Sequence, residues 1–356
     1  MSKTENSFVV FHNQSVFKMI EGLFHSIPAG LCGQRQQRPA GDPEWRRSFS
    51  IFRSAAAWAA AAFLSVMLTG CASGNPTARL KTGNLFHDQP VRSSEEVADY
   101  DSLVLKIEGA QIYGQILKPD RSFGDKRPCV LMFHGFAGFG RFDDIGQALC
   151  RAGCVVLIPH HRGAWGSQGK YSVSNCVTDA VSLVRYVRDP DFQKKYGIDP
   201  DAVFLIGHSM GGNTVLNAAA SGSAVRGIVM IAPCDIGTLS LRMSKKEMRE
   251  FLVENGLEVL HTDGFEAVYS DLAAHASQYA FPNAAAKLKN VHLFLAMGEW
   301  DTCISNELLN AFYAGAKGSK SLLSCTSRSY KARHGLMGAR TLLSRDITEF
   351  ILKSLK

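Results

Sequence analysis

Residues 204–216 read FLIGHSMGGNTVL, so that Ser209 stands among glycines, after an apolar run and before a helix-like stretch. The pattern Gly-x-Ser-x-Gly is typical of a nucleophile elbow, a sharp turn from a strand into a helix that exposes a serine hydroxyl. Such a turn needs small neighbours, because backbones approach closely there, and Gly207, Gly211 and Gly212 supply them. We therefore interpret Ser209 as a candidate catalytic nucleophile.

A serine needs a base that takes its proton and a carboxylate that orients the base. His334, in the glycine-flanked loop YKARHGLMG, follows the last predicted strand and is the candidate base. Asp301, in LFLAMGEWDTC, follows a predicted strand and is the candidate acid. Asp235 is the reserve acid and Glu299 a weaker one. These positions follow strands, at the edge of the sheet where open α/β folds carry their sites.

Acyl transfer also needs backbone N–H groups directed at the developing oxyanion. We expect one from Met210, directly after the serine, and the other from Phe136 in the run CVLMFHGFAGFG. His134 and His208 are interpreted as structural, because adjacent residues on a tight turn point apart and His134 ends a strand.

The segment PHHRGAWGSQG is predicted to be an active-site loop. Arg162 and Trp165 are candidate substrate-binding residues, with a solvated arginine and a packed tryptophan as equal alternatives. His160 and His161 have no further ligands at helical or hairpin spacing, so we predict no metal and no cofactor.

The elements that would position these residues alternate along the chain. SLVLKIEGAQIYGQILKP predicts a hairpin that turns near Glu108-Gly109, and a helix with an apolar face ends before Asp189-Pro190. A last helix is predicted over 336–355. Near-continuous apolar runs, typical of parallel strands buried on both faces, occur at 129–133, 154–159, 202–206, 227–231, 291–296 and 321–325. The alternation predicts an α/β fold with a doubly wound, mostly parallel sheet.

Residues 235–290 interrupt this alternation with helical stretches only. We expect a small helical cap over the mouth of the sheet. Its apolar stripe, which would line an acyl pocket or simply pack on the main domain, comprises Met248, Phe251, Leu252 and Leu257.

Several of these segments together resemble the α/β-hydrolase superfamily, in particular dienelactone-hydrolase-like and prolyl-oligopeptidase-like catalytic domains. They are HGFAG, HHRGAWGS, YGIDPDAVFLIGHSMGG, GEWD and RHG, and the resemblance covers about 102–356. It implies the α/β-hydrolase fold and a hydrolase. The chain differs from dienelactone hydrolases in having Ser209 where a cysteine nucleophile is usual. It differs from prolyl oligopeptidases because the residues that follow Cys71 are too few to form a propeller domain.

The sequence pattern of the N-terminal region predicts that the protein is exported. Arg46, Arg47 and Arg53 precede the uncharged run SAAAWAAAAFLSVMLTGC, whose apolar part suits a secretory signal better than a membrane span. Its end, LTGC, resembles a bacterial lipobox, which implies lipidation at Cys71. We therefore expect a signal region over 1–71, with 1–45 from a start site assigned too early, and a linker over 72–101. The expected location is the bacterial cell envelope, most simply the outer membrane facing the periplasm; an uncleaved anchor is the alternative.

Charge and cysteine content narrow the remaining choices. Of the net charge of +7, +3 lies in residues 1–70, and no basic stripe with interleaved aromatics occurs, so we expect no nucleic-acid partner. The seven cysteines after Cys71 give no regular disulfide framework, although a Cys303–Cys325 pair is conceivable.

The sequence thus predicts a serine hydrolase that cleaves a small-molecule carboxylic ester through an acyl-enzyme. A serine aminopeptidase is the alternative enzyme, although no Glu-Glu pair for a substrate amine is evident. A catalytically silent hydrolase fold that serves as an envelope lipoprotein is the alternative outside catalysis.

Overall fold

The computed structural model describes residues 80–88, 94 and 97–356. The predicted signal region, with Cys71, lies outside the described residues, as does part of the predicted linker. Among the residues that are described, no helix has both the length and the apolar content to cross a membrane.

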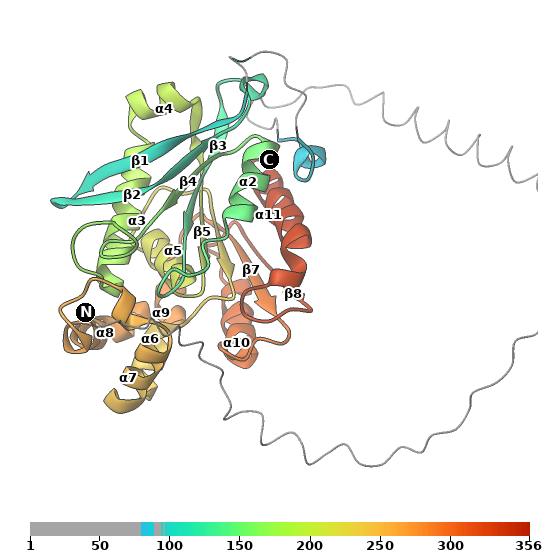
Figure 1. Cartoon of the computed structure of the whole chain (residues 1–356). Coiled ribbons are helices and arrows are strands. Elements are labelled where there is room, and N and C mark those ends of the chain that lie inside the picture. The colour runs from blue at the N-terminus through green and yellow to red at the C-terminus, as the bar shows by residue number, and fades with distance from the viewer. Residues whose placement is uncertain (1–79, 89–93, 95–96) are drawn as a thin grey trace, which may run out of the picture. The chain divides into compact units, whose positions relative to one another are not determined.

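The centre of the fold is one eight-stranded sheet with the order β1-β2-β4-β3-β5-β6-β7-β8 (Figure 1). The pairs β1–β2 and β2–β4 are antiparallel, and all other neighbours are parallel. The predicted doubly wound, mostly parallel sheet is therefore confirmed. The strands are β1 Asp99–Ile107, β2 Ala110–Lys118, β3 Arg127–Phe133, β4 Val155–Pro159, β5 Ile198–His208, β6 Gly227–Ile231, β7 His292–Gly298 and β8 Ser324–Tyr330.

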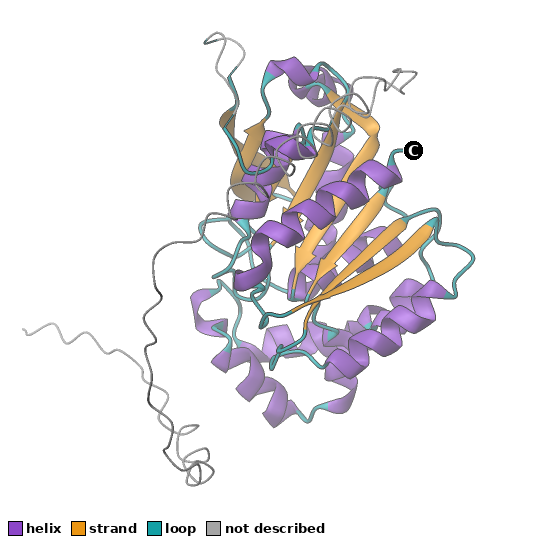
Figure 2. Ribbon diagram, turned by 90° about the vertical axis from the view of Figure 1, so that its right-hand side faces the viewer, coloured by secondary structure: helices purple, strands orange, loops and turns teal. Residues whose placement is uncertain are grey.

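Helices cover both faces of this sheet (Figure 2). Side chains of α2 and α11 belong to one core cluster, and those of α3, α5 and α10 to the other. The α-helices are α2 Asp143–Ala152, α3 Val173–Val187, α4 Pro190–Tyr196, α5 Met210–Ala220, α6 Ile236–Arg242, α7 Lys245–Glu254, α8 Phe265–Tyr279, α9 Phe281–Ala285, α10 Asn306–Lys317 and α11 Arg340–Ser354. Short 3₁₀ turns are η2 Thr82–Asn84, η3 Arg121–Phe123, η4 Leu257–Val259 and η5 Met337–Ala339.

Local sequence explains most of these boundaries. The hairpin turns at Glu108 and Gly109, both at positive φ (46° and 85°), which suits a two-residue turn between right-twisted strands. The Ser172 hydroxyl caps α3, and Asp189 caps the separate helix α4, whose first residue is Pro190. Every residue of β3, β4 and β6 is buried, as their continuous apolar runs predict.

The segment predicted to form a cap contains α6, α7, η4, α8 and α9, which gather at one end of the sheet (Figure 1). That it covers the mouth of the sheet as a cap stays a prediction. His261 ties it to the loop after β4: its N–H donates to the carbonyl oxygen of Gly163 at 2.7 Å, and its own carbonyl accepts from the N–H of Tyr171 at 2.8 Å. In the predicted stripe, Met248, Leu252 and Leu257 belong to the main core cluster, and Phe251 packs against it. These contacts favour the packing interpretation of the stripe.

Two predicted elements were misplaced. The strand predicted at 321–325 is β8 Ser324–Tyr330, which lies at the edge of the sheet, where half-exposed polar residues leave no apolar run to mark it. The last helix begins at Arg340 rather than Leu336, because Leu336 has a positive φ of 49° and η5 intervenes.

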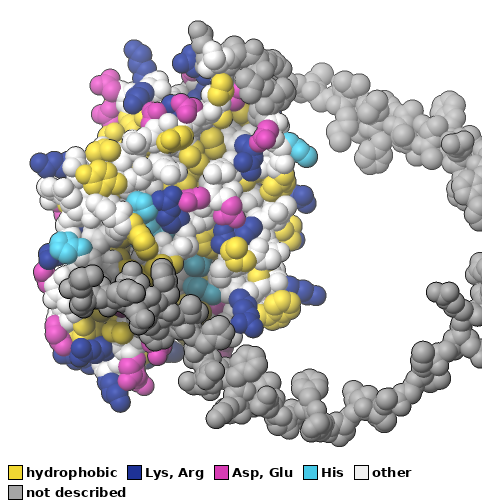
Figure 3. All heavy atoms as spheres, viewed as in Figure 1, with side chains coloured by type: hydrophobic (Ala, Val, Ile, Leu, Met, Phe, Trp, Pro, Cys, Tyr) yellow, Lys and Arg dark blue, Asp and Glu magenta, His cyan; other side chains and the backbone are white. Residues whose placement is uncertain are grey.

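Basic and acidic side chains are interspersed over the described part of the face drawn in Figure 3. The seven cysteines of the described residues are free, and Cys303 and Cys325 are not bonded to each other.

Candidate active site

Ser209 stands on the strained turn that the sequence predicts. Its φ of 53° and ψ of −117° lie outside the regions that L-residues favour, and such strain persists only where the surroundings hold it. Here they do: its N–H donates to the Ile231 carbonyl at 2.9 Å, and its own carbonyl accepts from the N–H of Cys234 at 2.9 Å. The turn between β5 and α5 is thus anchored to the end of the adjacent strand β6.

The glycines around Ser209 are required by close backbone contacts. A Cβ atom added to Gly207 would lie 2.0 Å from the carbonyl oxygen of Gly211, and one added to Gly211 would lie 2.2 Å from that of Phe133. No side chain fits at either position, so these glycines allow the helix to leave the strand sharply enough to expose the serine.

The structure brings Asp301 and His334 together, although 33 residues separate them. Nδ1 of His334 donates to Oδ2 of Asp301 over 2.8 Å. The Asp301 side chain is 1% exposed, whereas that of His334 is 23% exposed. Because a carboxylate only accepts, the neutral imidazole carries its proton on Nδ1, and its Nε2 lone pair is left available as a base.

The Asp301 carboxylate is held in its ionised form. Its Oδ1 accepts from the N–H groups of Cys303 at 2.8 Å and Ile304 at 3.0 Å. Burial alone would raise the pKa of Asp301, but the hydrogen bond and charge of His334, together with these two N–H groups, bring the net pKa below its ordinary value of 3.8. The carboxylate therefore orients the ring and would stabilise an imidazolium.

Backbone contacts join the two loops that carry this pair. The N–H of Trp300 donates to the Ala332 carbonyl at 3.0 Å, and that of Glu299 donates to the Tyr330 carbonyl at 2.8 Å. A Cβ on Gly298 would lie 2.7 Å from the same Ala332 oxygen, so a glycine is needed for the loops to meet. The Asp301–His334 distance is consequently set by the pairing of β7 with β8.

His208, the residue directly before Ser209, contacts His334. The ring centroids of His208 and His334 are 4.7 Å apart, and Nε2 of His208 donates to the His334 carbonyl at 3.1 Å. Among the described residues, no hydrogen bond joins the Ser209 hydroxyl to the His334 ring. Nucleophile–base contacts are often looser before substrate binds, and the hydroxyl is free to rotate.

The two predicted oxyanion-hole residues, Phe136 and Met210, have backbone N–H groups that are available to donate a hydrogen bond. Within the described part of the chain, neither the Phe136 N–H nor the Met210 N–H donates to a protein acceptor. Met210 begins α5, where helix N–H groups have no internal partner. Gly135 holds the other loop close to the serine: a Cβ there would lie 3.0 Å from that of Ser209. Donation by both groups to an oxyanion stays a prediction.

A cluster of neutral histidines packs next to the loop that contains Gly135 and Phe136. Nδ1 of His134 donates to the Gly135 carbonyl at 2.7 Å, and its Nε2 accepts from the N–H of His161 at 3.3 Å. Burial, then the charge of His161, lowers the pKa of His134 well below 6.5. Burial also lowers the pKa of His161 and of His160 to about 4. These rings act as fixed hydrogen-bonding groups.

The predicted substrate-binding residues have different surroundings. Arg162 is buried, with its guanidinium on the carboxylates of Asp179 and Glu108, and these contacts favour a structural role. Trp165 is 46% exposed, and its ring N–H donates to the Ala137 carbonyl at 2.6 Å, next to Phe136. Its ring stands edge-on to that of Phe139, which is 68% exposed. A substrate contact for Trp165 stays a prediction.

The two reserve acids do not contact His334. The Asp235 carboxylate caps α6, accepting from the N–H and hydroxyl of Thr238 at 3.0 and 2.7 Å and from the N–H of Phe281 at 3.2 Å. Burial raises its pKa. Glu299 is exposed.

Two contacts near the site were not predicted from the sequence. His208 contacts His334, and its position directly before Ser209 is the sequence feature that could have indicated this. Cys303 lies beside the Asp301–His334 pair.

Comparisons with known proteins match parts of this chain. A family model described as serine aminopeptidase, S33, matches residues 124–255, which include Phe136 and Ser209 but end before Asp301. Monoglyceride lipase from Rattus norvegicus is 30% identical over 133 residues, or 36% of this chain and 42% of that protein; the Mus musculus lipase is 30% identical over 135 residues. The chain thus spans less than half the length of the curated relatives it matches.

Solved structures match a larger share of the chain. Est1E from Butyrivibrio proteoclasticus, bound to ferulic acid, has a TM-score of 0.56 and 17% identity, covering 71% of this chain and 99% of its own. The Pyrococcus furiosus esterase Pf2001 has a TM-score of 0.52 and 17% identity, covering 75% and 97%. At such identity the likeness concerns the fold, and with the eight-stranded sheet it establishes the α/β-hydrolase fold.

Proposed function

We propose that this chain, an α/β-hydrolase by fold, is a serine hydrolase that cleaves carboxylic esters through an acyl-enzyme on Ser209. The observation that carries the proposal is the 2.8 Å contact between Asp301 and His334, which leaves Nε2 of His334 as a base beside the strained Ser209 turn. Matches to a monoglyceride lipase and to esterase structures support the ester substrate class.

In the first half-reaction, His334 takes the Ser209 proton on Nε2 while the Ser209 oxygen attacks the ester carbonyl carbon. The carbonyl oxygen becomes an oxyanion that accepts from the N–H groups of Met210 and Phe136. When the tetrahedral intermediate collapses, the C–O bond to the alcohol breaks, and the His334 imidazolium gives its proton to the departing oxygen. The acyl group remains on Ser209.

In the second half-reaction, a water molecule takes the place of the alcohol. His334 removes its proton, the hydroxide attacks the acyl carbon, and the Ser209 oxygen leaves with the proton from His334. Asp301 stays ionised throughout, in agreement with its lowered pKa, and stabilises the imidazolium in both halves. Protein groups and water carry out every step of this scheme.

A fluorophosphonate probe and a substrate panel test the proposal. We expect the probe to label the wild type and not Ser209→Ala, with the label recovered on the peptide that contains Ser209. The panel compares p-nitrophenyl esters of increasing acyl length with aminoacyl p-nitroanilides, and we expect a higher kcat/KM for esters. A folded chain that neither reacts with the probe nor turns over any ester would support the silent-scaffold alternative.

A serine aminopeptidase is the second candidate, because the matching family model carries that description. An aminopeptidase needs a carboxylate that pairs with the substrate ammonium group. Asp301 and Asp235 are both committed to other partners. The same panel separates the candidates, since a peptidase would prefer aminoacyl amides with a free amine and lose rate when the amine is acetylated.

We also propose that Cys71 is lipidated and that the protein is attached to the bacterial envelope. The sequence order of basic flank, apolar run and LTGC supports this. Membrane fractionation tests it: Cys71→Ser should move the protein out of the carbonate-washed membrane fraction. A variant that stays in that fraction would indicate an uncleaved span instead.

A further inference from the structure

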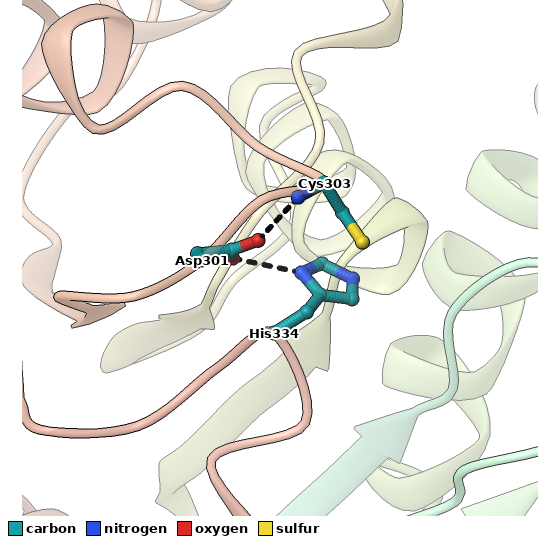
Figure 4. A group of neighbouring side chains, drawn as sticks. All are labelled: Asp301, Cys303 and His334. Carbon is teal, nitrogen blue, oxygen red and sulfur yellow. Dashed lines mark hydrogen bonds and ion pairs between the residues drawn. The ribbon is translucent and has the colours of Figure 1, made fainter. Parts of the chain in front are cut away.

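The thiol of Cys303 lies beside the Asp301–His334 pair (Figure 4). A carboxylate oxygen of Asp301, the sulfur of Cys303 and a ring nitrogen of His334 all lie within 4.8 Å of one another. Cys303 is exposed, and its sulfur points toward the His334 ring. The proposed hydrolysis gives this thiol no role.

Two of the three side chains have an atom that is available to bind a metal ion. Both Asp301 oxygens are occupied, Oδ2 by the His334 ring and Oδ1 by the N–H groups of Cys303 and Ile304. The sulfur of Cys303 and Nε2 of His334 remain. A carboxylate that holds the far ring N–H of a histidine is the arrangement that commonly supports a metal-binding imidazole, because it fixes the tautomer and raises ligand basicity. Asp301 already does this.

The donor types select the ion. A thiolate and an imidazole suit Zn²⁺ and other thiophilic ions, whereas Mg²⁺ and Ca²⁺ prefer oxygen ligands. Zn–S and Zn–N bonds are about 2.3 and 2.0–2.1 Å long, so two ligands of one ion must lie closer together than the 4.8 Å within which the Cys303 sulfur and one ring nitrogen of His334 lie. Rotation of the exposed Cys303 side chain about its Cα–Cβ bond can close the difference.

We propose that Cys303 and His334 form an inhibitory binding site for a thiophilic divalent cation such as Zn²⁺, with Asp301 orienting the imidazole. On binding, the thiol proton leaves to solvent, and the sulfur and Nε2 each donate a lone pair to the ion; nothing is oxidised or reduced. Water completes the coordination. With its Nε2 lone pair engaged, His334 cannot take a proton from Ser209, and removal of the ion restores the base.

The inference goes beyond the proposed esterase activity, so its main test does not depend on turnover. Cd²⁺ is titrated into the Ser209→Ala protein and followed by calorimetry and by the ultraviolet Cd²⁺–thiolate band. We expect one ion per chain, and Cys303→Ser in the same background should abolish the band and weaken binding by about tenfold or more. The serine keeps the backbone N–H that Asp301 accepts. Cys325→Ser, at a half-buried thiol in β8, is the matched control and should bind as the parent does.

A second measurement addresses inhibition. Zn²⁺ should slow ester hydrolysis and fluorophosphonate labelling of the wild type, EDTA should restore both, and Cys303→Ser should need about tenfold more Zn²⁺, relative to its own metal-free rate. Equal Cd²⁺ binding by a folded Cys303→Ser protein would overturn the site. Binding without any measurable turnover in the wild type would instead count against the esterase and leave the site in place.

Discussion

His208 donates a 3.1 Å hydrogen bond from Nε2 to the backbone carbonyl of His334, although 126 residues separate them. Burial, and then the charge of His334, lowers the pKa of His208 to about 3, so its ring is neutral at physiological pH. Because His208 directly precedes Ser209, this contact links the turn of the nucleophile to the loop of the base.

The link predicts that His208 positions the base. His208→Ala removes the hydrogen bond and should lower kcat by about tenfold, the size of one net hydrogen bond, with KM little changed. His208→Gln offers an amide N–H to the same carbonyl and should recover part of the activity. Stopped-flow measurement of acylation checks this, and an alanine variant with the wild-type acylation rate would show that the contact only packs.

The assignment of the acid is tested by two asparagine variants. Asp301→Asn should lower kcat by about 10⁴-fold, because the amide favours the wrong histidine tautomer. Asp235→Asn should keep most activity and most of the stability, because an asparagine oxygen can still accept from the N–H groups of Thr238 and Phe281 and caps a helix about as well as aspartate. Ser209→Ala and His334→Ala provide the background rate. The reverse order of the two variants would move the acid to Asp235.

Acid should destabilise the fold well above the pH at which carboxylates protonate. His134, His160, His161 and His208 all have a pKa below 6.5 in the folded chain. The unfolded chain therefore binds more protons below pH 6.5, so their contribution is complete above that pH and is lost as the pH falls toward 4 and 3.

Urea unfolding at several pH values between 7.5 and 4 measures this slope. One such histidine contributes about 1.4 kcal/mol per pH unit. His208→Gln, which has no ring to protonate, should reduce the slope by about one proton. An unchanged slope in that variant would mean that His208 titrates alike in the folded and unfolded chains.

The Arg162–Asp179 pair predicts a stability effect rather than a substrate effect. Both side chains are almost fully buried, at 8% and 2% exposure. Arg162→Gln leaves the buried Asp179 charge without its partner and should cost about 3–5 kcal/mol of unfolding free energy. Asp179→Asn should cost less, because Arg162 keeps its contact with Glu108. Chemical denaturation measures the cost. If Arg162→Gln kept its stability but raised KM for the preferred ester, the substrate-binding role would be the correct one.

Substrate choice should depend on the exposed aromatic residues rather than on the buried stripe of the cap. Met248 packs in the main core, so Met248→Ala should cost about 2–5 kcal/mol of stability and leave the preferred acyl length unchanged. Trp165→Ala or Phe139→Ala should change that preference, at roughly 1–3 kcal/mol for each methylene-sized part of the pocket wall that is removed. Ester hydrolysis measured over a series of acyl lengths checks both. A folded Met248→Ala enzyme with a shifted chain-length profile would restore the cap as a lining of the acyl pocket.

The sequence allowed the prediction of features that have a local signature. The parallel strands are marked by buried apolar runs, and the Ser209 turn by its glycines; Asp301 and His334 could be paired because both follow strands that end at one edge. Side-chain contacts across long separations leave no such pattern. The Arg162–Asp179 pair, the His208 contact and the nearness of Cys303 therefore emerged only in three dimensions. The register of β8 was missed because a half-exposed strand lacks an apolar run.

The position of β8 has a consequence for thermal inactivation. This strand carries the loop of His334 and is half exposed, and within the described part of the chain it is paired on one side only, with β7. Edge elements open more readily than the centre of a sheet, because fewer contacts must be broken. Fraying of β8 would move His334 away from Asp301 while the remaining sheet stays intact. Amide exchange at 324–330 should therefore follow the loss of activity on heating, below the temperature at which the whole domain melts.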